Sequence, residues 1–239
     1  MESLEAERER ARDLDVSDLA DAIESIGFEC TRCGACCKAV EGCEGDETDQ
    51  DGDADATTDA AEGHDHTATV FPDEVRELQE TDEYDWRDVA RPMPYGLVDG
   101  EDGPQGETFE WALETDDCGD CTFYAEDDDG VGACTVHEDR PLVCRTYPFS
   151  VALGGTSQPM GEAVDEAGMV RAHECEGLGR DISREHAEEL AEALKERAVR
   201  ELDEAIAVRD GYHPVERDPG DVVVFDSEGA KRPDGSRID

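Results

Sequence analysis

The stretch C-T-R-C-G-A-C-C contains the densest group of chemically active residues in the chain. It places Cys30, Cys33, Cys36 and Cys37 within eight residues. Thiolates are soft ligands that suit zinc, copper(I) and iron–sulfur clusters, and a two-residue gap lets a tight turn direct two sulfurs at one ion. Gly34 suits such a turn because glycine adopts positive φ at little cost. Neighbouring side chains diverge, so Cys36 and Cys37 need not bind the same ion or cluster.

The second half of the chain adds five more cysteines in short motifs. C-G-D-C contains Cys118 and Cys121, C-T-V-H contains Cys134, R-P-L-V-C-R-T-Y-P-F contains Cys144, and H-E-C-E-G contains Cys175. With Cys43 the total is ten. In a reducing compartment, cysteines at this density are expected to be ligands or redox thiols rather than structural disulfides.

Three interpretations of these cysteines compete: metal or cluster binding, thiol redox catalysis, and inert buried thiols. The density of the first four argues against inert core positions. Thiol exchange needs an accessible nucleophile of low pKa, usually where a strand meets a helix N-terminus. The overlapping C-x-x-C run lies in no clear βαβ context, so the sequence favours metal or cluster binding.

The spacing leaves the kind of metal open. A two-cluster ferredoxin would need a fourth cysteine at position 40 followed by proline, but Val40 stands there. The C-x3-C-x2-C order of radical-SAM enzymes fails at the same position. No glycine-rich nucleotide loop is present, so no organic cofactor is indicated. An iron–sulfur cluster, of the [4Fe–4S] type, and a four-thiolate zinc site both stay possible.

Four basic residues flank the cysteines in a chain that has little positive charge. The cations that flank them are Arg32, Lys38, Arg140 and Arg145. Because several thiolates on one metal leave a net negative charge, we expect Arg140 or Arg145 beside the site, with Arg145 the first choice. The alternative is that these cations only pair with surface acids. We expect Tyr147 to pack around the site and limit solvent.

Histidines supply further candidate ligands. His137 and His173 follow or precede a cysteine by two or three residues. His64 and His66 lie at the end of the acidic stretch, where histidines more often have no specific partner. We therefore keep all four as alternatives to the cysteines.

Taken together, the motifs resemble the CxxCxxCC family of zinc- or iron-chelating proteins, also described as YkgJ-like cysteine-cluster proteins. The resemblance runs from Phe28 to about Gly177 and leaves Cys43 and Cys118 outside the pattern. It implies metal or iron–sulfur binding through eight positions: Cys30, Cys33, Cys36, Cys37, Cys121, Cys134, Cys144 and Cys175. A flagellin lysine methylase is similar to this family, which adds a methylase-like activity as an alternative, although no methyl-donor site is evident.

Charge sets the expected environment. The 239 residues include 66 acidic and 21 basic ones, for a net charge of -45. Such repulsion is tolerated in concentrated salt, so we expect a protein adapted to a salt-rich cytoplasm. The charge argues against binding to nucleic acid or to an anionic membrane. Neither a signal peptide nor an apolar run of ~20 residues is evident. A protein partner is left open.

The pattern of elements predicts an irregular α+β fold. We expect helices over 17–26, capped by Ser17 and ended by Gly27, over 72–80, and from Ser183 to Gly211. Short antiparallel strands are expected near 109–113 and 222–225, with a hairpin turn at 127–130. The expected division is a charged segment with a short helix (1–27), a cysteine-cluster domain (28–180, with a disordered acidic insertion at 41–67) and a C-terminal helix, strand and polar tail (181–239).

The functional hypothesis that follows is a cysteine-rich metal-binding protein. The first form is an iron–sulfur protein that transfers electrons or supports an enzyme. The second is a structural zinc module that binds a partner. Whether the chain is itself an enzyme is left open by its sequence.

Overall fold

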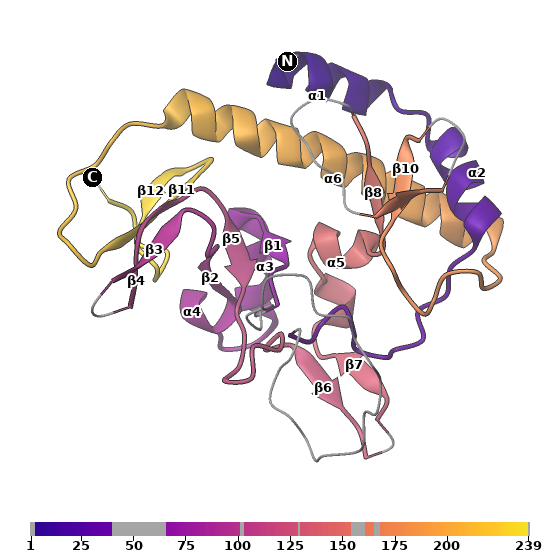
Figure 1. Cartoon of the computed structure of the whole chain (residues 1–239), viewed down its shortest axis with the longest axis horizontal. Coiled ribbons are helices and arrows are strands. Elements are labelled where there is room, and N and C mark those ends of the chain that lie inside the picture. The colour runs from indigo at the N-terminus through magenta and orange to yellow at the C-terminus, as the bar shows by residue number, and fades with distance from the viewer. Residues whose placement is uncertain are drawn as a thin grey trace, which may run out of the picture.

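The computed structural model describes residues 3–39, 66–100, 103–128, 130–153, 161–164 and 168–238. Helices and several small sheets make up an α+β fold, as predicted, with a long helix near the C-terminus (Figure 1). Most of the expected acidic insertion, including Cys43 and His64, lies outside the described residues. The domain boundaries stay predictions.

The longest element is α6 (Arg184–Gly211), against which the two N-terminal helices α1 (Leu4–Asp13) and α2 (Val16–Ile26) pack. The Ser183 hydroxyl accepts a hydrogen bond from the His186 amide at 3.2 Å, which confirms the predicted cap. The helix ends at Gly211, also as predicted. In Figure 1 it spans the top of the molecule above the sheets.

The first two helices differ in detail from the sequence-based expectation. The charged segment before Leu14 forms α1, and Ala11 on this helix is fully buried. Arg8 holds α1 to α6 by pairing with Asp203 at 3.0 Å. The cap of α2 is Asp15 and not Ser17, because the Asp15 carboxylate accepts hydrogen bonds from the first turn. The helix does end at Gly27.

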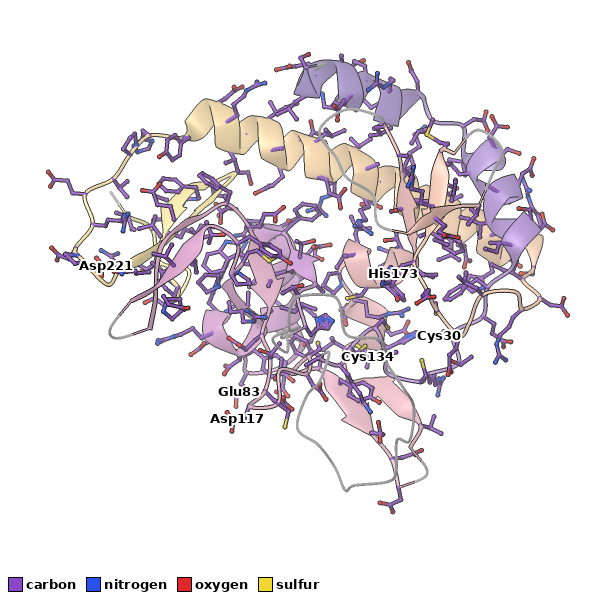
Figure 2. All side chains as sticks on the ribbon, viewed as in Figure 1. Cys30, Glu83, Asp117, Cys134, His173 and Asp221 are labelled. Atoms are coloured by element: carbon purple, nitrogen blue, oxygen red, sulfur yellow. The ribbon has the colours of Figure 1, made fainter. Side chains whose placement is uncertain are left out.

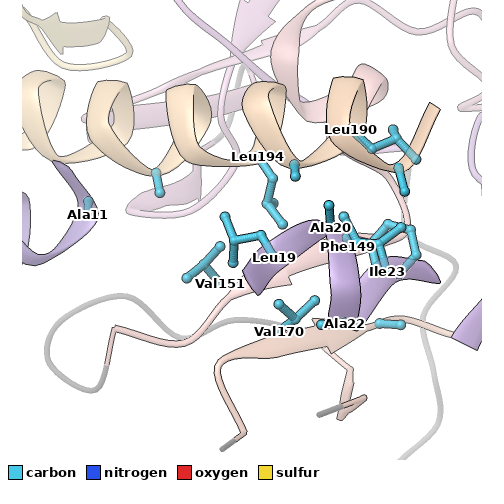
Figure 3. Packing of buried hydrophobic residues seen from close by; sticks show 14 of the residues in the cluster. Ala11, Leu19, Ala20, Ala22, Ile23, Phe149, Val151, Val170, Leu190 and Leu194 are labelled. Atoms are coloured by element: carbon cyan, nitrogen blue, oxygen red, sulfur yellow. The ribbon is translucent and has the colours of Figure 1, made fainter. Parts of the chain in front are cut away.

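A first hydrophobic core joins α2 and α6 to a small sheet (Figure 3). Leu19, Ile23 and Leu194 meet across the two helices, and Phe149 from the sheet packs in the same cluster. The sheet contains β8 (Phe149–Val151), β10 (Val170–Ala172) and β9 (Glu162–Ala163) in that order. Burial of each large side chain contributes about 1.5–3 kcal/mol, so this core fixes α2 and the chain that leaves it.

A second core forms around another three-stranded sheet. Its order is β1 (Thr69–Val70), β5 (Trp111–Leu113) and β2 (Ala90–Pro92). Helices α3 (Pro72–Thr81) and α4 (Trp86–Val89) belong to the same core, where the rings of Trp86 and Trp111 meet edge to face at 5.0 Å. Helix α3 confirms the prediction over 72–80.

The C-terminal segment completes a four-stranded sheet. Its order is β12 (Gly229–Lys231), β11 (Val222–Asp226), β4 (Gly103–Thr108) and β3 (Leu97–Gly100). The β11–β4 pair is parallel and the other pairs are antiparallel. The segment that follows Asp226 is therefore an ordered part of the fold, in which Lys231 is almost completely buried.

The remaining elements lie close to the cysteines. Strands β6 (Tyr124–Glu126) and β7 (Gly132–Cys134) form the hairpin predicted at 127–130. A 3-10 turn η1 (His137–Asp139) leads to α5 (Leu142–Thr146). Among the helices in the described part of the chain, none combines the length and apolar character that crossing a bilayer requires.

Candidate metal centre

The loop that follows α2 carries the first four cysteines and runs between the β6–β7 hairpin and α5 (Figure 1). Figure 2 labels Cys30 on this loop and Cys134 at the end of β7, both in this region. Backbone hydrogen bonds join the loop to the segments that carry the later cysteines. They run from the Gly132 amide to the Arg32 carbonyl (2.8 Å), from Cys121 to Cys37 (2.8 Å) and from Glu29 to Gly177 (3.0 Å).

Gly34 forms the turn of this loop. Its φ is +78°, and its carbonyl accepts hydrogen bonds from the amides of Cys37 (2.7 Å) and Lys38 (3.1 Å). A Cβ at this position would lie 2.2 Å from the Tyr124 hydroxyl. Both the backbone conformation and the neighbouring ring therefore require glycine here, and the positive φ expected from the sequence is confirmed.

Four of the cysteines, which we call the inner cysteines, belong to the second core or pack against it. Cys121 belongs to that core and is only 7% exposed, and the other three are half-buried and pack against it. The inner cysteines are Cys37, Cys121, Cys134 and Cys144. They come from the N-terminal loop, the segment before β6, strand β7 and helix α5, so only the tertiary fold groups them.

The other four, which we call the outer cysteines, lie outside the second core. Cys30 and Cys36 are exposed, and Cys33 and Cys175 are half-buried. Cys175 packs against the first core instead of the second. Its sulfur accepts a hydrogen bond from the Gly177 amide at 3.4 Å. The two adjacent residues Cys36 and Cys37 therefore belong to different groups.

Burial dominates the protonation of the inner thiols. Burial, with a smaller effect of the neighbouring sulfurs of Cys134 and Cys36, raises the pKa of Cys121 to about 11. Burial also raises the pKa of Cys144, with added repulsion from Cys121 and Cys134. These mutual effects show that the inner sulfurs lie within electrostatic range of one another. A bound cation would offset this repulsion and stabilise the thiolates.

A sulfur–sulfur hydrogen bond links Cys36 and Cys37. Their Sγ atoms are 3.7 Å apart. A hydrogen bond from Cys37 lowers the pKa of Cys36 to about 7, and the same bond, with burial, raises the pKa of Cys37. Cys36 is therefore the thiol of this pair that ionises first.

The sulfurs lie in one region, but they do not form a metal coordination shell in this conformation. Over the described residues, no three Cys, His, Asp or Glu side chains are arranged to hold a metal ion as they stand. The donor set nonetheless fits a thiolate-binding metal, because the soft sulfurs of the loop, β7 and α5 share one region. The assignment of all eight cysteines as metal ligands therefore stays a prediction.

One arginine lies beside the sulfurs. The charge of Arg140 lowers the pKa of Cys36, after the larger effect of Cys37, and acts in the same direction on Cys134 and Cys144. Its Nε donates to the His137 carbonyl at 2.9 Å, which fixes the guanidinium near the end of β7. Arg145 is exposed on α5, so its predicted role beside a cluster stays a prediction.

Tyr147 and His173 form a wall next to the outer cysteines. Their rings meet edge to face at 6.0 Å, and the Tyr147 hydroxyl donates to the Glu174 carbonyl at 2.9 Å. Burial, together with the charge of a Cys175 thiolate, raises the pKa of Tyr147 to about 12. The phenol therefore stays neutral, and its expected role in limiting solvent at the site stays a prediction. His137, by contrast, points to solvent.

His66 is the residue that the sequence analysis undervalued. Its Nε2 lies 2.9 Å from the Cys36 carbonyl oxygen, and its Nδ1 is buried without a hydrogen-bond partner in the described structure. Its carbonyl accepts a hydrogen bond from Arg91 at 2.8 Å. Burial lowers the pKa of the ring, so it is held neutral against the cysteine loop. Its acidic, low-complexity surroundings in the sequence gave no sign of this contact.

The disulfide state divides the cysteines further. The eight cysteines implied by the resemblance are free thiols. Cys118 is instead disulfide-bonded, so the expectation that the cysteines are ligands or redox thiols is wrong for this residue. Consequently the C-G-D-C motif supplies Cys121 alone to the candidate site.

Fold and site together define a protein in which cysteines from separate parts of the chain surround a candidate thiolate metal centre. A sequence model of the CxxCxxCC family, described as a "putative zinc- or iron-chelating domain", matches residues 29–176. The chain belongs to this family of cysteine-rich metal-binding proteins. No curated protein and no solved structure matches the chain.

Proposed function

We propose that the protein binds a [4Fe–4S] cluster through the inner cysteines and uses it to transfer electrons or to support an enzyme. The observation that carries this proposal is the grouping of four free cysteines around one apolar core. Four thiolates are the usual ligand set of such a cluster. Membership of the family supports chelation of iron or zinc and does not distinguish between the two metals.

The surrounding residues have consistent roles in this proposal. The core behind Cys121 excludes water, and burial is one of the properties that set a cluster's reduction potential. Arg140 supplies a positive charge beside the sulfurs. Gly34 holds the loop in the turn that brings Cys37 to the Cys121 backbone. When bound, the cluster would supply one-electron chemistry.

The outer cysteines favour a second, different candidate: a structural zinc site that serves an interaction with a partner. Two of these four thiols are exposed, and one of them, Cys36, has a pKa near neutrality. A closed four-thiolate zinc site close to the surface is a common structural device. Under this alternative, zinc binding would hold the N-terminal loop to the segment around Cys175.

Metal analysis after anaerobic purification tests the proposal. We expect brown protein with charge-transfer absorption and about four irons and four sulfides per chain. Bound zinc in addition would support a second site at the outer cysteines. Colourless protein with stoichiometric zinc and no sulfide would refute the cluster.

Two matched variants test the division of the cysteines. Cys144→Ser removes an inner ligand, so it should abolish the cluster absorption. Cys175→Ser removes an outer thiol and should leave the absorption in place. Equal loss of iron in Cys144→Ser and Cys175→Ser would contradict the division.

A further inference from the structure

A cavity of about 790 Å³ lies between the C-terminal half of α6 and the second core. Its lining follows α6 from Leu194 to Arg209, about 22 Å at the helical rise of 1.5 Å per residue. At one end the Arg197 guanidinium reaches the Thr146 hydroxyl of α5 at 3.0 Å. The volume is in the range of small-molecule sites, about 300–1,000 Å³.

The walls of this cavity, which we call the α6 groove, are mainly apolar. Val70 and Met93 come from the sheet side, and Leu202 and Ala205 come from α6. Phe109 is partly exposed and lines the same space. Such walls suit an extended hydrocarbon or aromatic body, which gains about 25 cal/mol for each Å² removed from water.

The acidic side chains that line the α6 groove are not all paired with cations. The two arginines of the lining are already paired: Arg197 with Glu201 at 2.6 Å, and Arg209 with Glu5 at 2.6 Å. The carboxylate of Glu110 has no hydrogen bond or ion pair to any described residue, and the charges that act on it come from other glutamates. A negative charge without a cation therefore faces the groove.

Glu204 extends this negative region along α6. It accepts a hydrogen bond from the Ser227 amide at 2.7 Å, and its charged neighbours are aspartates. Burial raises the pKa of both Glu110 and Glu204, and the surrounding carboxylates raise it further. Glu110 is exposed and Glu204 is half-buried. Carboxylates without a counterion beside apolar walls cost free energy, which a cationic ligand would offset.

We propose that the α6 groove binds a small amphiphilic amine, with its apolar body against Met93 and Leu202 and its protonated amino group beside Glu110 and Glu204. Charge complementarity selects a cation, and the apolar walls select an extended body. The inference goes beyond the proposed metal function and does not depend on which metal the cysteines bind. Because Tyr147 and His173 also line the groove, the ligand would lie next to the cysteine site.

A methyl-labelled titration of the full-length, as-isolated protein tests the site. The probe is n-octylammonium, with 1-octanol and octanoate as neutral and anionic matches. In protein carrying [13C-methyl]methionine, Met93 lines the groove, whereas Met169 packs against the first core and serves as an internal control. We expect a saturable shift of Met93 alone and affinity about ten-fold higher for octylammonium than for octanol.

Matched variants identify the charge that selects the amine. Glu110→Gln should weaken octylammonium binding about ten-fold and leave octanol binding unchanged. Glu192→Gln removes the same charge from an exposed position on α6 outside the groove and should have no effect. Equal losses in the two variants would mean that the amine only senses the overall negative surface, which would overturn the inference.

Other outcomes also decide the question. If octanol bound as tightly as octylammonium, or if the signals of Met93 and Met169 shifted together, the proposed amine site would be overturned. If a lysine-containing peptide saturated the Met93 shift at a lower concentration than octylammonium, the ligand would be a protein and the small-amine proposal would be overturned. Binding by protein that metal analysis finds free of iron would keep this inference while the cluster proposal fails.

Discussion

At the scale of single residues, Lys231 shows how strongly the C-terminal segment is tied to the fold. Its ammonium is 2% exposed and lies 2.7 Å from Asp226 and 2.8 Å from Glu228. It also lies 5.1 Å from the centre of the Trp86 ring. Asp226 in turn accepts a hydrogen bond from the Trp111 indole at 2.8 Å. This buried network joins β11 and β12 to the second core.

Lys231→Met tests the network. The substitution keeps the length of the side chain and leaves Asp226 buried without its cation. Breaking a buried pair in this way costs about 3–5 kcal/mol, so we expect chemical denaturation to show a loss of that size. Arg76→Gln, which removes an exposed partner of Glu228, is the control and should cost about 0–1 kcal/mol. Equal small losses would show that the network contributes little.

Gly34→Ala tests the cysteine loop. The new Cβ requires an unfavourable positive φ, about 1–2 kcal/mol, and collides with the Tyr124 ring. We expect reduced metal content as well as reduced stability. Gly130→Ala is the matched control, because Gly130 has φ +77° but open space around it. Wild-type metal content in Gly34→Ala would show that the turn does not position the ligands.

At the scale of elements, α3 and α5 are joined through one carboxylate. Glu74 is 6% exposed on α3, and it accepts hydrogen bonds from the Phe71 amide and from the Leu142 amide at the start of α5, both at 2.9 Å. Burial raises its pKa, and the two amide bonds oppose that effect. Because α5 carries Cys144, this contact links the second core to the candidate site.

Glu74→Ala should loosen α5. It leaves two amides without their acceptor, at about 1–3 kcal/mol for each one that is left unpaired. We expect lower stability in denaturation and faster loss of metal to a chelator. Glu77→Ala removes an exposed acid from the same helix and should change neither quantity by much. Unchanged chelation kinetics in Glu74→Ala would separate α5 from metal retention.

At the scale of the whole molecule, the net charge of -45 is the dominant electrostatic feature. The acids are spread over the chain, and many lie at exposed positions. The ion pairs of α1 with α6 and of Arg200 with Asp73 use part of the small supply of cations. The remaining acids repel one another, which opposes the compact state.

A folding titration in KCl measures this repulsion. The screening length falls from about 10 Å at 0.1 M to about 3 Å at 1 M, so we expect the midpoint of thermal unfolding to rise with salt. Circular dichroism between 0.1 and 3 M KCl would follow the change. Full folding at low salt, with a midpoint that does not move, would contradict the expected adaptation to a salt-rich cytoplasm.

The sequence alone predicted the elements whose signals are local. The cap at Ser183, the stop at Gly211, the start of α3 at Pro72 and the turn at 127–130 depend on residues near one another in the chain. Thiol chemistry and spacing likewise predicted metal binding through cysteines, and the family match supports it. Local hydrogen bonding and side-chain chemistry are properties that a sequence carries directly.

Only the tertiary structure decided how these parts meet. The packing of α1 depends on Asp203, almost two hundred residues from Arg8, and the position of His66 depends on the cysteine loop. The gathering of Cys37 with Cys121, Cys134 and Cys144 follows from their shared contact with the second core, whereas Cys36, whose sulfur contacts that of Cys37, lies outside that core. Such groupings are set by distances through space, which arise from the packing of the entire chain.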